Sequence, residues 1–529
     1  MNKKLIILII LLAFILRFYQ LGKAPLGLNW DEASNGYNAY SILKTGRDEY
    51  GKFLPLFNRS FNDYKPPAYM YFNVPTVAIF GLTPFAARLP SAFFGTLTVL
   101  LTYFLTKKLF DDSKQKQSTA LVVMLMLAIS PWHLQVSRVG FEASIGLFFT
   151  VASFTAFLYS VLHQNNDRFK KVLLIISAIL FGLSAYTYHS ERIVIPLMFL
   201  ATVIIYKKEI FAVSKKYSSV FVVILILSAM PLLFLMPKEA VSQRFESITL
   251  TSYTEDVEKS VELIKQDQLI NFPWTNLLHN RRVIIGLRYV KNYFANFDPN
   301  FLFTKGDDNF RHHIENMGML YLWQLPLVLA GLYFLIKERS KTSIFLIAWL
   351  LLSPTAATPS NASPHALRDL TTVIPLTVIS AIGFTNLLKN LHNNKIFIVF
   401  SLFTFHFSLF TYLHNYYVHY PRDFASFWQY GYLDAAKKTE ELKDQYTKIK
   451  ISGDIEQGYI FWLFATKYDP ASYQQLITTN HFDKFYFKAE APENPDELYV
   501  SGSLDESFNV IDTIYLPNGQ KTIEIGHRR

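Results

Sequence analysis

Charged side chains of the kinds that transfer protons and bind anions lie in short segments between long apolar runs. The first segment, GLNWDEASNGYNAY, carries the adjacent carboxylates Asp31 and Glu32. Adjacent carboxylates can act as a general base with a partner or as metal ligands. The same pair also suits the first turn of a helix, where acidic side chains offset the helix dipole. The dipeptide alone leaves both interpretations open.

A lysine follows in the segment DYKPPAYMYFNVP, where Lys65 precedes Pro66 and Pro67. The prolines favour an extended chain, which would hold the ammonium group at the membrane surface, at the depth of a lipid phosphate. Lys65 is therefore a candidate phosphate ligand, and Tyr64 beside it is a candidate substrate contact. The alternative is a lysine that reaches along the membrane surface and caps the next helix.

Two later turns add further charges. In SPWHLQVSRVGFEASIGLFF, Arg138 and Glu142 stand four residues apart, which fits either an ion pair at a helix end or an anion-binding arginine beside another carboxylate. The turn SAYTYHSERIVIP combines His189 and Arg192, and arginine presents a fork that matches phosphate oxygens. Tyr188 in this turn is a candidate substrate contact. A solvated hairpin turn explains the same residues.

The segment NFDPNFLFTKGDDNFRHHIENMG contains the metal-capable side chains Asp307, Asp308, His312 and His313. Their spacing matches no dedicated metal site. We therefore predict no required cofactor, while a divalent metal stays compatible with the sequence and would use Asp307 and Asp308. Substrate contact is expected instead from Arg311 and His312.

The composition indicates a membrane protein. The chain has 529 residues, of which 51% are hydrophobic, 17% are charged and none is cysteine. A soluble chain of this length would form several domains with a more highly charged surface. The apolar residues are concentrated before about residue 413, in runs that approach the roughly 20 residues needed to cross a bilayer as a helix. Intrinsic disorder, a disulfide scaffold, thiol chemistry and cysteine-based zinc sites are excluded.

We predict a mostly α-helical polytopic membrane protein. The first apolar run, in MNKKLIILIILLAFILRF, is expected to be retained because no small-residue cleavage site follows it. The stretch 67–81 is short and interrupted by Pro75, so we expect an interfacial helix in the first outer loop. The predicted spans, about eleven in number, are 5–21, 89–106, 118–135, 143–162, 170–187, 191–206, 218–236, 318–336, 342–356, 370–388 and 395–413.

The orientation follows from the lysines and arginines, which concentrate in cytoplasmic loops. Alternate connections are short and basic, which places the N-terminus in the cytoplasm. The loops 22–88 and 237–317 and residues 414–529 are then outside. The net charge of +10 is therefore a topology signal, and we exclude a nucleic-acid partner. The basic residues are Lys3, Lys4, Lys107, Lys108, Lys114, Lys116, Arg168, Lys170, Lys171, Lys207, Lys208, Lys215, Lys216, Lys337, Arg339, Lys341, Lys389 and Lys395.

The C-terminal part, 414–529, is predicted to form a small extracytoplasmic α/β domain after a transmembrane domain at 1–413. The segment PRDFASFWQYGYLDAAKKTEELKDQY is typical of an amphipathic helix. The β-like runs YTKIKIS, GYIFWLFA, KFYFKA, ELYVSG and TIYLPNGQKTIEI follow it. Asn518-Gly519 in the last run predicts a hairpin with a type I′ turn.

The candidate site residues all map to the outer side in this topology, including Arg368 in the turn 357–369. The topology was derived from lysines elsewhere, so this agreement is partly independent of it. Acidic and basic groups that face outward favour a site where a phosphate-bearing lipid meets an acceptor.

The chain resembles the GT-C superfamily of integral-membrane glycosyltransferases, and most the bacterial branch related to protein O-mannosyltransferases and aminoarabinose transferases, which is similar to glycosyltransferase family 39. The resemblance rests on the Asp31-Glu32 pair, on Lys65-Pro66-Pro67 before the interfacial helix, and on ARLPSAFFGTLTVLLTYFLTKKLF at 87–110. The stretch SPWHLQVSR with the following Glu142 is similar to the family's second acidic region. The resemblance covers residues 1–200 well and the later spans loosely.

The resemblance implies a polyprenyl-phosphate-linked sugar donor and inverting transfer to a protein, lipid or glycan acceptor on the extracytoplasmic face. It implies that Asp31 is the general base, that Glu32 is its neighbour in the catalytic site and that Lys65 contacts the donor phosphate. Glu142 stands where relatives often carry Asp and would orient the acceptor or the sugar. Further phosphate contacts are expected by position from Arg138, His189, Arg192 and Arg368.

Two other functions stay open at this stage. A transporter or flippase of lipid-linked sugars would show broken helices at the membrane midplane, buried charges and repeat symmetry. Most of the predicted spans lack central charges, and no repeat is evident. A polymerase or ligase of lipid-linked glycans shares the large outer loops and differs in taking a lipid-linked oligosaccharide rather than a single sugar.

Overall fold

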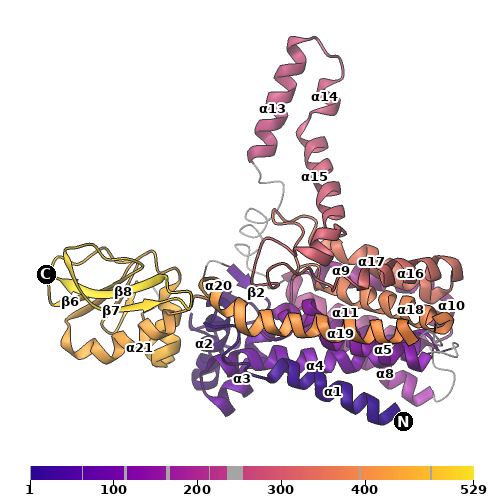
Figure 1. Ribbon diagram of the computed structural model, residues 1–529, viewed down its shortest axis with the longest axis horizontal. Helices are drawn as coiled ribbons and strands as arrows, with labels where there is room; N and C mark the ends of the chain where they lie inside the picture. The colour runs from indigo at the N-terminus through magenta and orange to yellow at the C-terminus, as the bar shows by residue number, and fades with distance from the viewer. Residues whose placement is uncertain are drawn as a thin grey trace. The chain divides into compact units, whose positions relative to one another are not determined.

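The computed structural model describes residues 2–61, 63–111, 116–162, 167–213, 215–234, 254–391, 395–476 and 479–529. Each of the predicted spans contains a helix (Figure 1). The predicted cytoplasmic residue Lys114 and the part 237–253 of the large outer loop lie outside the described residues. The helices in the span regions are α1 (Asn2–Phe18), α4 (Pro84–Leu109), α5 (Lys116–Ile129), α6 (Pro131–Ser137), α7 (Glu142–Leu162), α8 (Asp167–Ser184), α9 (Glu191–Ile205), α11 (Lys215–Phe234), α16 (Gln324–Glu338), α17 (Lys341–Leu352), α18 (Val373–Leu391) and α19 (Lys395–His414).

Length and composition qualify four segments of the described chain as membrane spans, or five if a bent pair counts as one. The four are Pro84–Leu109, Glu142–Leu162, Lys215–Leu232 and Leu370–Lys389. The bent pair is α5 and α6, which meet at an angle of 57°. The break lies before Pro131, whose ring suits the first turn of a helix. The apolar helices are confirmed, and the full number of spans stays a prediction.

The first outer loop contains α2 (Trp30–Thr45), β1 (Asn58–Ser60), β2 (Asp63–Lys65) and α3 (Ala68–Phe80). The strands β1 and β2 form an antiparallel pair that places Asn58 opposite Lys65. The predicted helix at 67–81 is present as α3, which has 13 residues. A helix of this length is too short to cross a bilayer, which needs about 20 residues.

The described part of the large outer loop is mostly helical up to Thr304. It contains α13 (Thr254–Leu269), α14 (Thr275–Leu278), α15 (Arg281–Ala295) and a short π-helical turn, η2 (Asn300–Thr304). The helices α13 and α15 lie side by side as a hairpin (Figure 1). An ion pair of 2.6 Å between Arg288 and Asp256 joins them.

The C-terminal part is an α/β structure with a six-stranded mixed sheet in the order β4-β5-β3-β6-β8-β7. The strand β3 is parallel to both β5 and β6, while β8 is antiparallel to β6 and β7. The strands are β3 (Lys448–Ile451), β4 (His481–Phe482), β5 (Phe485–Phe487), β6 (Glu497–Ser501), β7 (Phe508–Tyr515) and β8 (Lys521–Arg528).

Three details of this part differ from the sequence prediction. The run GYIFWLFA is not a strand but the buried helix α22 (Gly458–Thr466). The predicted long amphipathic helix is divided into α20 (Tyr420–Asp423), the 3₁₀ turn η6 (Ala425–Trp428) and α21 (Tyr432–Leu442). The positive φ angles of Gln429 (46°) and Gly431 (94°) separate η6 from α21. A further short helix, α23 (Pro470–Tyr473), follows α22.

The predicted hairpin between β7 and β8 is confirmed, but its turn type is wrong. A type I′ turn needs a positive φ at both central residues, and in the dipeptide Asn518-Gly519 only Gly519 has one, of 87°. The Gly519 N–H donates to the Leu516 carbonyl at 2.9 Å, and the Leu516 N–H donates to the Gln520 carbonyl at 2.7 Å. This is a three-residue loop with glycine in the left-handed position, and Pro517 suits its first place.

Contacts divide the chain into two compact units. The first unit comprises Met1–Leu11, Leu97–His133 and Gly146–Leu402, and the second comprises Leu12–Thr96, Leu134–Ile145 and Phe403–Arg529. In the second unit, one hydrophobic core joins α2 and α3 to the C-terminal sheet and α22. The C-terminal part therefore shares its core with the first outer loop. The domain boundary expected at 413/414 stays a prediction.

Glycine allows α16 and α18 of the first unit to approach closely. A Cβ atom at Gly331 would lie 2.0 Å from the Ile379 carbonyl oxygen, and one at Gly383 would lie 2.1 Å from that of Leu327. Small residues that let backbones approach are typical of helix packing in membranes.

We expect Gly383→Ala to lower the free energy of unfolding by about 1–3 kcal/mol, because the added methyl group overfills this contact. The matched control is Gly286→Ala in α15, where a Cβ meets nothing within 4 Å. That change should raise the stability by about 0.5–1 kcal/mol through helix propensity. Thermal unfolding of the purified proteins in detergent measures both, and an unchanged or higher Tm for Gly383→Ala would contradict the contact.

Candidate active site

The adjacent carboxylates Asp31 and Glu32 lie in the first turn of α2. Asn29 caps this helix: its side-chain oxygen accepts a hydrogen bond of 3.0 Å from the Asp31 N–H. The Glu32 carboxylate accepts one of 2.9 Å from the Asn29 N–H, which completes a capping box. The helix start suggested by the sequence is therefore present, and it fixes the position of both acids.

Glu32 is fully buried and its oxygens are fully used. Arg88 of α4 donates to both of them, at 2.8 Å from Nε and 3.1 Å from Nη2. The Gly140 N–H donates a further bond of 2.7 Å. Glu32 thus links α2, α4 and the turn at 138–141. A carboxylate held by four donors is a positioning group, and no lone pair of Glu32 is left for a substrate proton.

Asp31 has a different environment from its neighbour. Its carboxylate forms an ion pair with the Lys65 ammonium group, and the two side chains are 27% and 14% exposed, so a ligand can reach them. Burial would lower the pKa of Lys65, but the negative charges of Asp31 and Glu142 more than offset it, and the pKa lies above its usual value. The lysine is therefore a permanent cation beside the helix N-terminus.

Glu142, the first residue of α7, is the second acid near Lys65. Its carboxylate accepts a hydrogen bond of 3.1 Å from the side chain of Asn35. Asn35 in turn accepts one of 3.2 Å from Asn58. The structure thus brings together three of the predicted site residues, Asp31, Lys65 and Glu142, all in the second unit. The Lys65 ammonium group can bind an anion, and a carboxylate beside it can accept a proton.

Arg138 is buried, and its guanidinium group is directed at the backbone. It donates to the carbonyl oxygens of Leu16 at 2.6 Å and Tyr19 at 2.8 Å. It also lies 4.9 Å from the ring centre of Tyr416. These contacts give Arg138 a positioning role between the end of α1 and the turn at 138–141. The phosphate contact expected from its position stays a prediction.

The other predicted contacts lie in the first unit, apart from Tyr64, which lies on β2 and is half-buried. Arg192 donates to the Ala185 carbonyl at 2.8 Å and lies 3.3 Å from the ring nitrogen of His189. Tyr188 and Arg368 are half-buried, and Asp308 is exposed. Arg311 donates to the side chain of Asn309 at 3.3 Å. Their roles in donor or substrate binding stay predictions.

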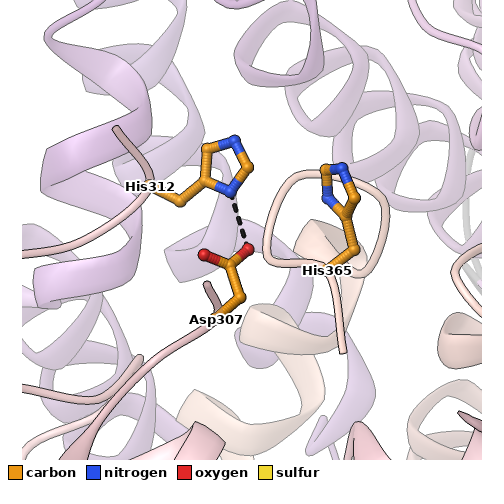
Figure 2. Close-up of side chains that lie close together, drawn as sticks. All are labelled: Asp307, His312 and His365. Atoms are coloured by element: carbon orange, nitrogen blue, oxygen red, sulfur yellow. Dashed lines mark hydrogen bonds and ion pairs between the residues drawn. The ribbon is translucent and has the colours of Figure 1, made fainter. Parts of the chain in front are cut away.

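Asp307 lies with His312 of the same segment and with a second histidine from a distant part of the chain. His312 Nδ1 lies 2.6 Å from the Asp307 carboxylate, and His365 from the turn 357–369 joins the pair (Figure 2). Burial would raise the pKa of Asp307, but His312 and the Ala366 N–H lower it to about 2. Burial lowers the pKa of His365 well below its usual value. Asp308, expected beside Asp307, is not part of this group.

Sequence reasoning missed Arg88, the partner of Glu32, and Asn35, the partner of Glu142. One signal for Arg88 was available: it is a lone charge in the apolar segment ARLPSAFFG, and a charge in such a place needs a buried partner. Asn35 gave no comparable signal, because a polar residue one turn after two acids fits any exposed helix.

The fold is similar to that of two solved integral-membrane transferases. ArnT from Cupriavidus metallidurans bound to undecaprenyl phosphate is similar over 99% of this chain and 98% of that chain, with a TM-score of 0.56 and 11% identity. The oligosaccharyltransferase of Archaeoglobus fulgidus in complex with Zn and sulfate is similar over 87% of this chain, with a TM-score of 0.52 and 15% identity. This chain covers 61% of the length of that chain.

The first part of the sequence is similar to one protein family. Residues 7–244 match the family described as dolichyl-phosphate-mannose-protein mannosyltransferase. An uncharacterized protein of Aquifex aeolicus is 35% identical over 107 residues, which are 20% of this chain and 24% of that protein. The resemblance predicted from the Asp31-Glu32 and Lys65-Pro66-Pro67 segments is confirmed, and the matched region contains both segments.

We expect Glu32→Gln to lower the free energy of unfolding by about 3–5 kcal/mol, because it leaves the buried Arg88 guanidinium group without its counter-charge. The matched control is Asp31→Asn, one residue away and partly exposed, which should change the stability by less than about 1 kcal/mol. Thermal unfolding in detergent compares the two. The double variant Glu32→Gln with Arg88→Gln should lose less stability than the sum of the losses in the two single variants. Equal Tm values for the two single variants would contradict the role of Glu32.

Proposed function

We propose that this protein is a glycosyltransferase that moves a sugar from a polyprenyl-phosphate-linked donor to an acceptor on the extracytoplasmic face. The ion pair of Asp31 and Lys65, partly exposed and flanked by Glu142, carries the proposal. The similarity in fold to ArnT, which was solved with undecaprenyl phosphate, and the match to a mannosyltransferase family support it. The sugar is a hexose or a pentose, and the acceptor is a protein, lipid or glycan.

The reaction is a single displacement with inversion at the anomeric carbon. The acceptor oxygen forms a bond to this carbon and loses its proton to the Asp31 carboxylate. The bond between the anomeric carbon and the phosphate oxygen breaks, and its electrons stay on the polyprenyl phosphate. The Lys65 ammonium group stabilises the charge that the phosphate gains. A phosphate is already a good leaving group, so no acid catalyst is needed.

Lys65 serves both stages of this reaction. Before the donor binds, its ammonium group neutralises Asp31, which weakens the carboxylate as a base. The donor phosphate competes for the same ammonium group and leaves Asp31 a stronger base next to the acceptor. Glu142, held by Asn35, orients the acceptor or the sugar. Glu32 acts through Arg88 and Gly140 and keeps α2 in place.

We expect Asp31→Asn to reduce transfer by about 10²–10⁴-fold, the usual contribution of a general base. Binding of undecaprenyl phosphate to the purified protein should be unchanged or tighter, because Lys65 loses a competing carboxylate. Lys65→Met should weaken that binding. Transfer is measured in cells that lack the gene and carry each variant, by mass spectrometry of surface glycans. The control is Asp434→Asn. Asp434 lies on α21, its side chain is 58% exposed, and it forms a surface ion pair with Lys437. Full transfer by Asp31→Asn would reject Asp31 as the base.

The proposal also requires Asp31 and Glu32 to lie on the extracytoplasmic side of the membrane. The chain has no cysteine, so single cysteines report the topology without background. We expect Lys52→Cys in the first outer loop to react with a membrane-impermeant maleimide in intact cells. Lys208→Cys in α10 (Lys207–Phe211) is equally exposed and should react only after lysis. The reverse pattern would place the site in the cytoplasm and would remove the basis for an extracytoplasmic transferase.

A further inference from the structure

Three metal-capable side chains converge in the first unit, and none of them has a role in the proposed reaction. Asp307 and His312 lie on the segment that follows η2, and His365 lies on the turn that precedes α18. One ligand atom from each lies within 4.8 Å of the others. Figure 2 shows the three side chains close together, with His312 hydrogen-bonded to the Asp307 carboxylate and the His365 ring beside them.

We propose that Asp307, His312 and His365 bind a Zn²⁺ ion, with one coordination position left to water. Two imidazole nitrogens and one carboxylate oxygen are a donor set typical of zinc with three protein ligands. Zinc holds such ligands at about 2.0–2.2 Å, so its tetrahedral ligand atoms lie roughly 3.3 Å apart. Here His312 Nδ1 lies 2.6 Å from the Asp307 carboxylate, and all three ligand atoms lie within 4.8 Å of one another. The spacing that zinc needs falls between these two distances. Small movements of the side chains would admit the ion in place of the hydrogen bond.

The surroundings of the ligands are already ordered for such a site. The Ala366 N–H donates to the Asp307 carboxylate at 2.8 Å and fixes its orientation. His313 Nε2 lies 2.7 Å from the Asp307 backbone oxygen, and this ring fits only because residue 306 is a glycine: a Cβ there would lie 2.6 Å from it. Trp132 donates to the Ala366 carbonyl at 3.0 Å. Outer contacts of this kind orient the ligands of metal sites.

Burial separates this group from an ordinary surface ion pair. Asp307 is 8% exposed and His312 is 3% exposed. The pair of Asp307 and His312 alone could be structural. It does not explain why the ring of His365, from a segment far along the chain, lies 5.1 Å from that of His312, centre to centre. Two imidazoles beside one carboxylate supply three donor atoms that a single metal ion can share.

The consequence of zinc binding is a link between two outer segments. The ion would tie the end of the large outer loop to the turn before α18, two segments that are separated along the chain by α16 and α17. This link does not depend on the proposed transfer reaction. Its presence or absence can therefore be established whether or not the protein transfers sugar.

The test is metal binding by the purified full-length protein. After removal of metal with EDTA and addition of ZnCl₂, we expect one tightly bound Zn²⁺ per chain by elemental analysis and a saturable rise in Tm. We expect Co²⁺ in its place to give the visible absorption of a four-coordinate site. His365→Gln should weaken zinc binding by more than about 100-fold, because even changes to outer contacts cost about 10–100-fold. Asp308→Asn, an exposed neighbour outside the group, should bind like the wild type.

His365→Gln is the decisive variant, because the His365 ring makes a long hydrogen bond of 3.4 Å with the Arg368 N–H and lies beside the His312 ring, contacts whose loss should cost little stability. The loss of zinc with an unchanged metal-free Tm would assign His365 as a ligand. Equal zinc binding by wild type and His365→Gln would overturn the proposal, as would a wild-type protein that binds no zinc. Binding of Mg²⁺ or Mn²⁺ in preference to Zn²⁺ would overturn the assignment to zinc.

Discussion

The buried ion pair of Glu32 and Arg88 is the interaction on which the candidate site depends. Two charges removed from water persist only when both are fully hydrogen-bonded, and here the Gly140 N–H and the backbone carbonyls of Pro25 and Gly27 complete the set. The network joins α2, α4 and the turn at 138–141 at one point. Successive residues on a helix point about 100° apart. Fixing Glu32 toward the interior therefore turns Asp31 toward Lys65, and the neighbouring acids acquire different roles.

The C-terminal part also supports α2. Gly36 on α2 has no side chain, and a Cβ there would lie 2.8 Å from the ring of Phe464 on α22. Gln429 accepts a hydrogen bond of 2.9 Å from Asn29, the residue that caps α2. The Tyr37 hydroxyl donates to the Tyr468 carbonyl at 3.0 Å. Residues beyond 413 thus hold the helix that carries the acids, in addition to any part they have in recognising an acceptor.

Much of this could be predicted from the sequence, and the exceptions have physical causes. Long apolar runs identify helices because a membrane leaves the backbone few alternatives. The run GYIFWLFA was misassigned because a short continuous apolar segment fits a buried helix as well as a buried strand. Asp31 and Lys65 could be found from local motifs. The different roles of Asp31 and Glu32 could not, because they depend on Arg88, which is distant in sequence. The grouping of His365 with Asp307 has the same cause.

Charge conservation explains why one lysine between two carboxylates suits the proposed reaction. Asp31, Glu142 and Lys65 together carry one negative charge, and the donor phosphate brings a second. During transfer the proton of the acceptor neutralises Asp31, while the leaving phosphate gains the charge that Asp31 loses. The total is unchanged, but the negative charge moves from the carboxylate to the phosphate. A single ammonium group that can contact either group stabilises the state after transfer as well as the state before it. The contact between Lys65 and the phosphate strengthens as the phosphate gains charge. It therefore lowers the activation barrier of the transfer and does not only hold the donor.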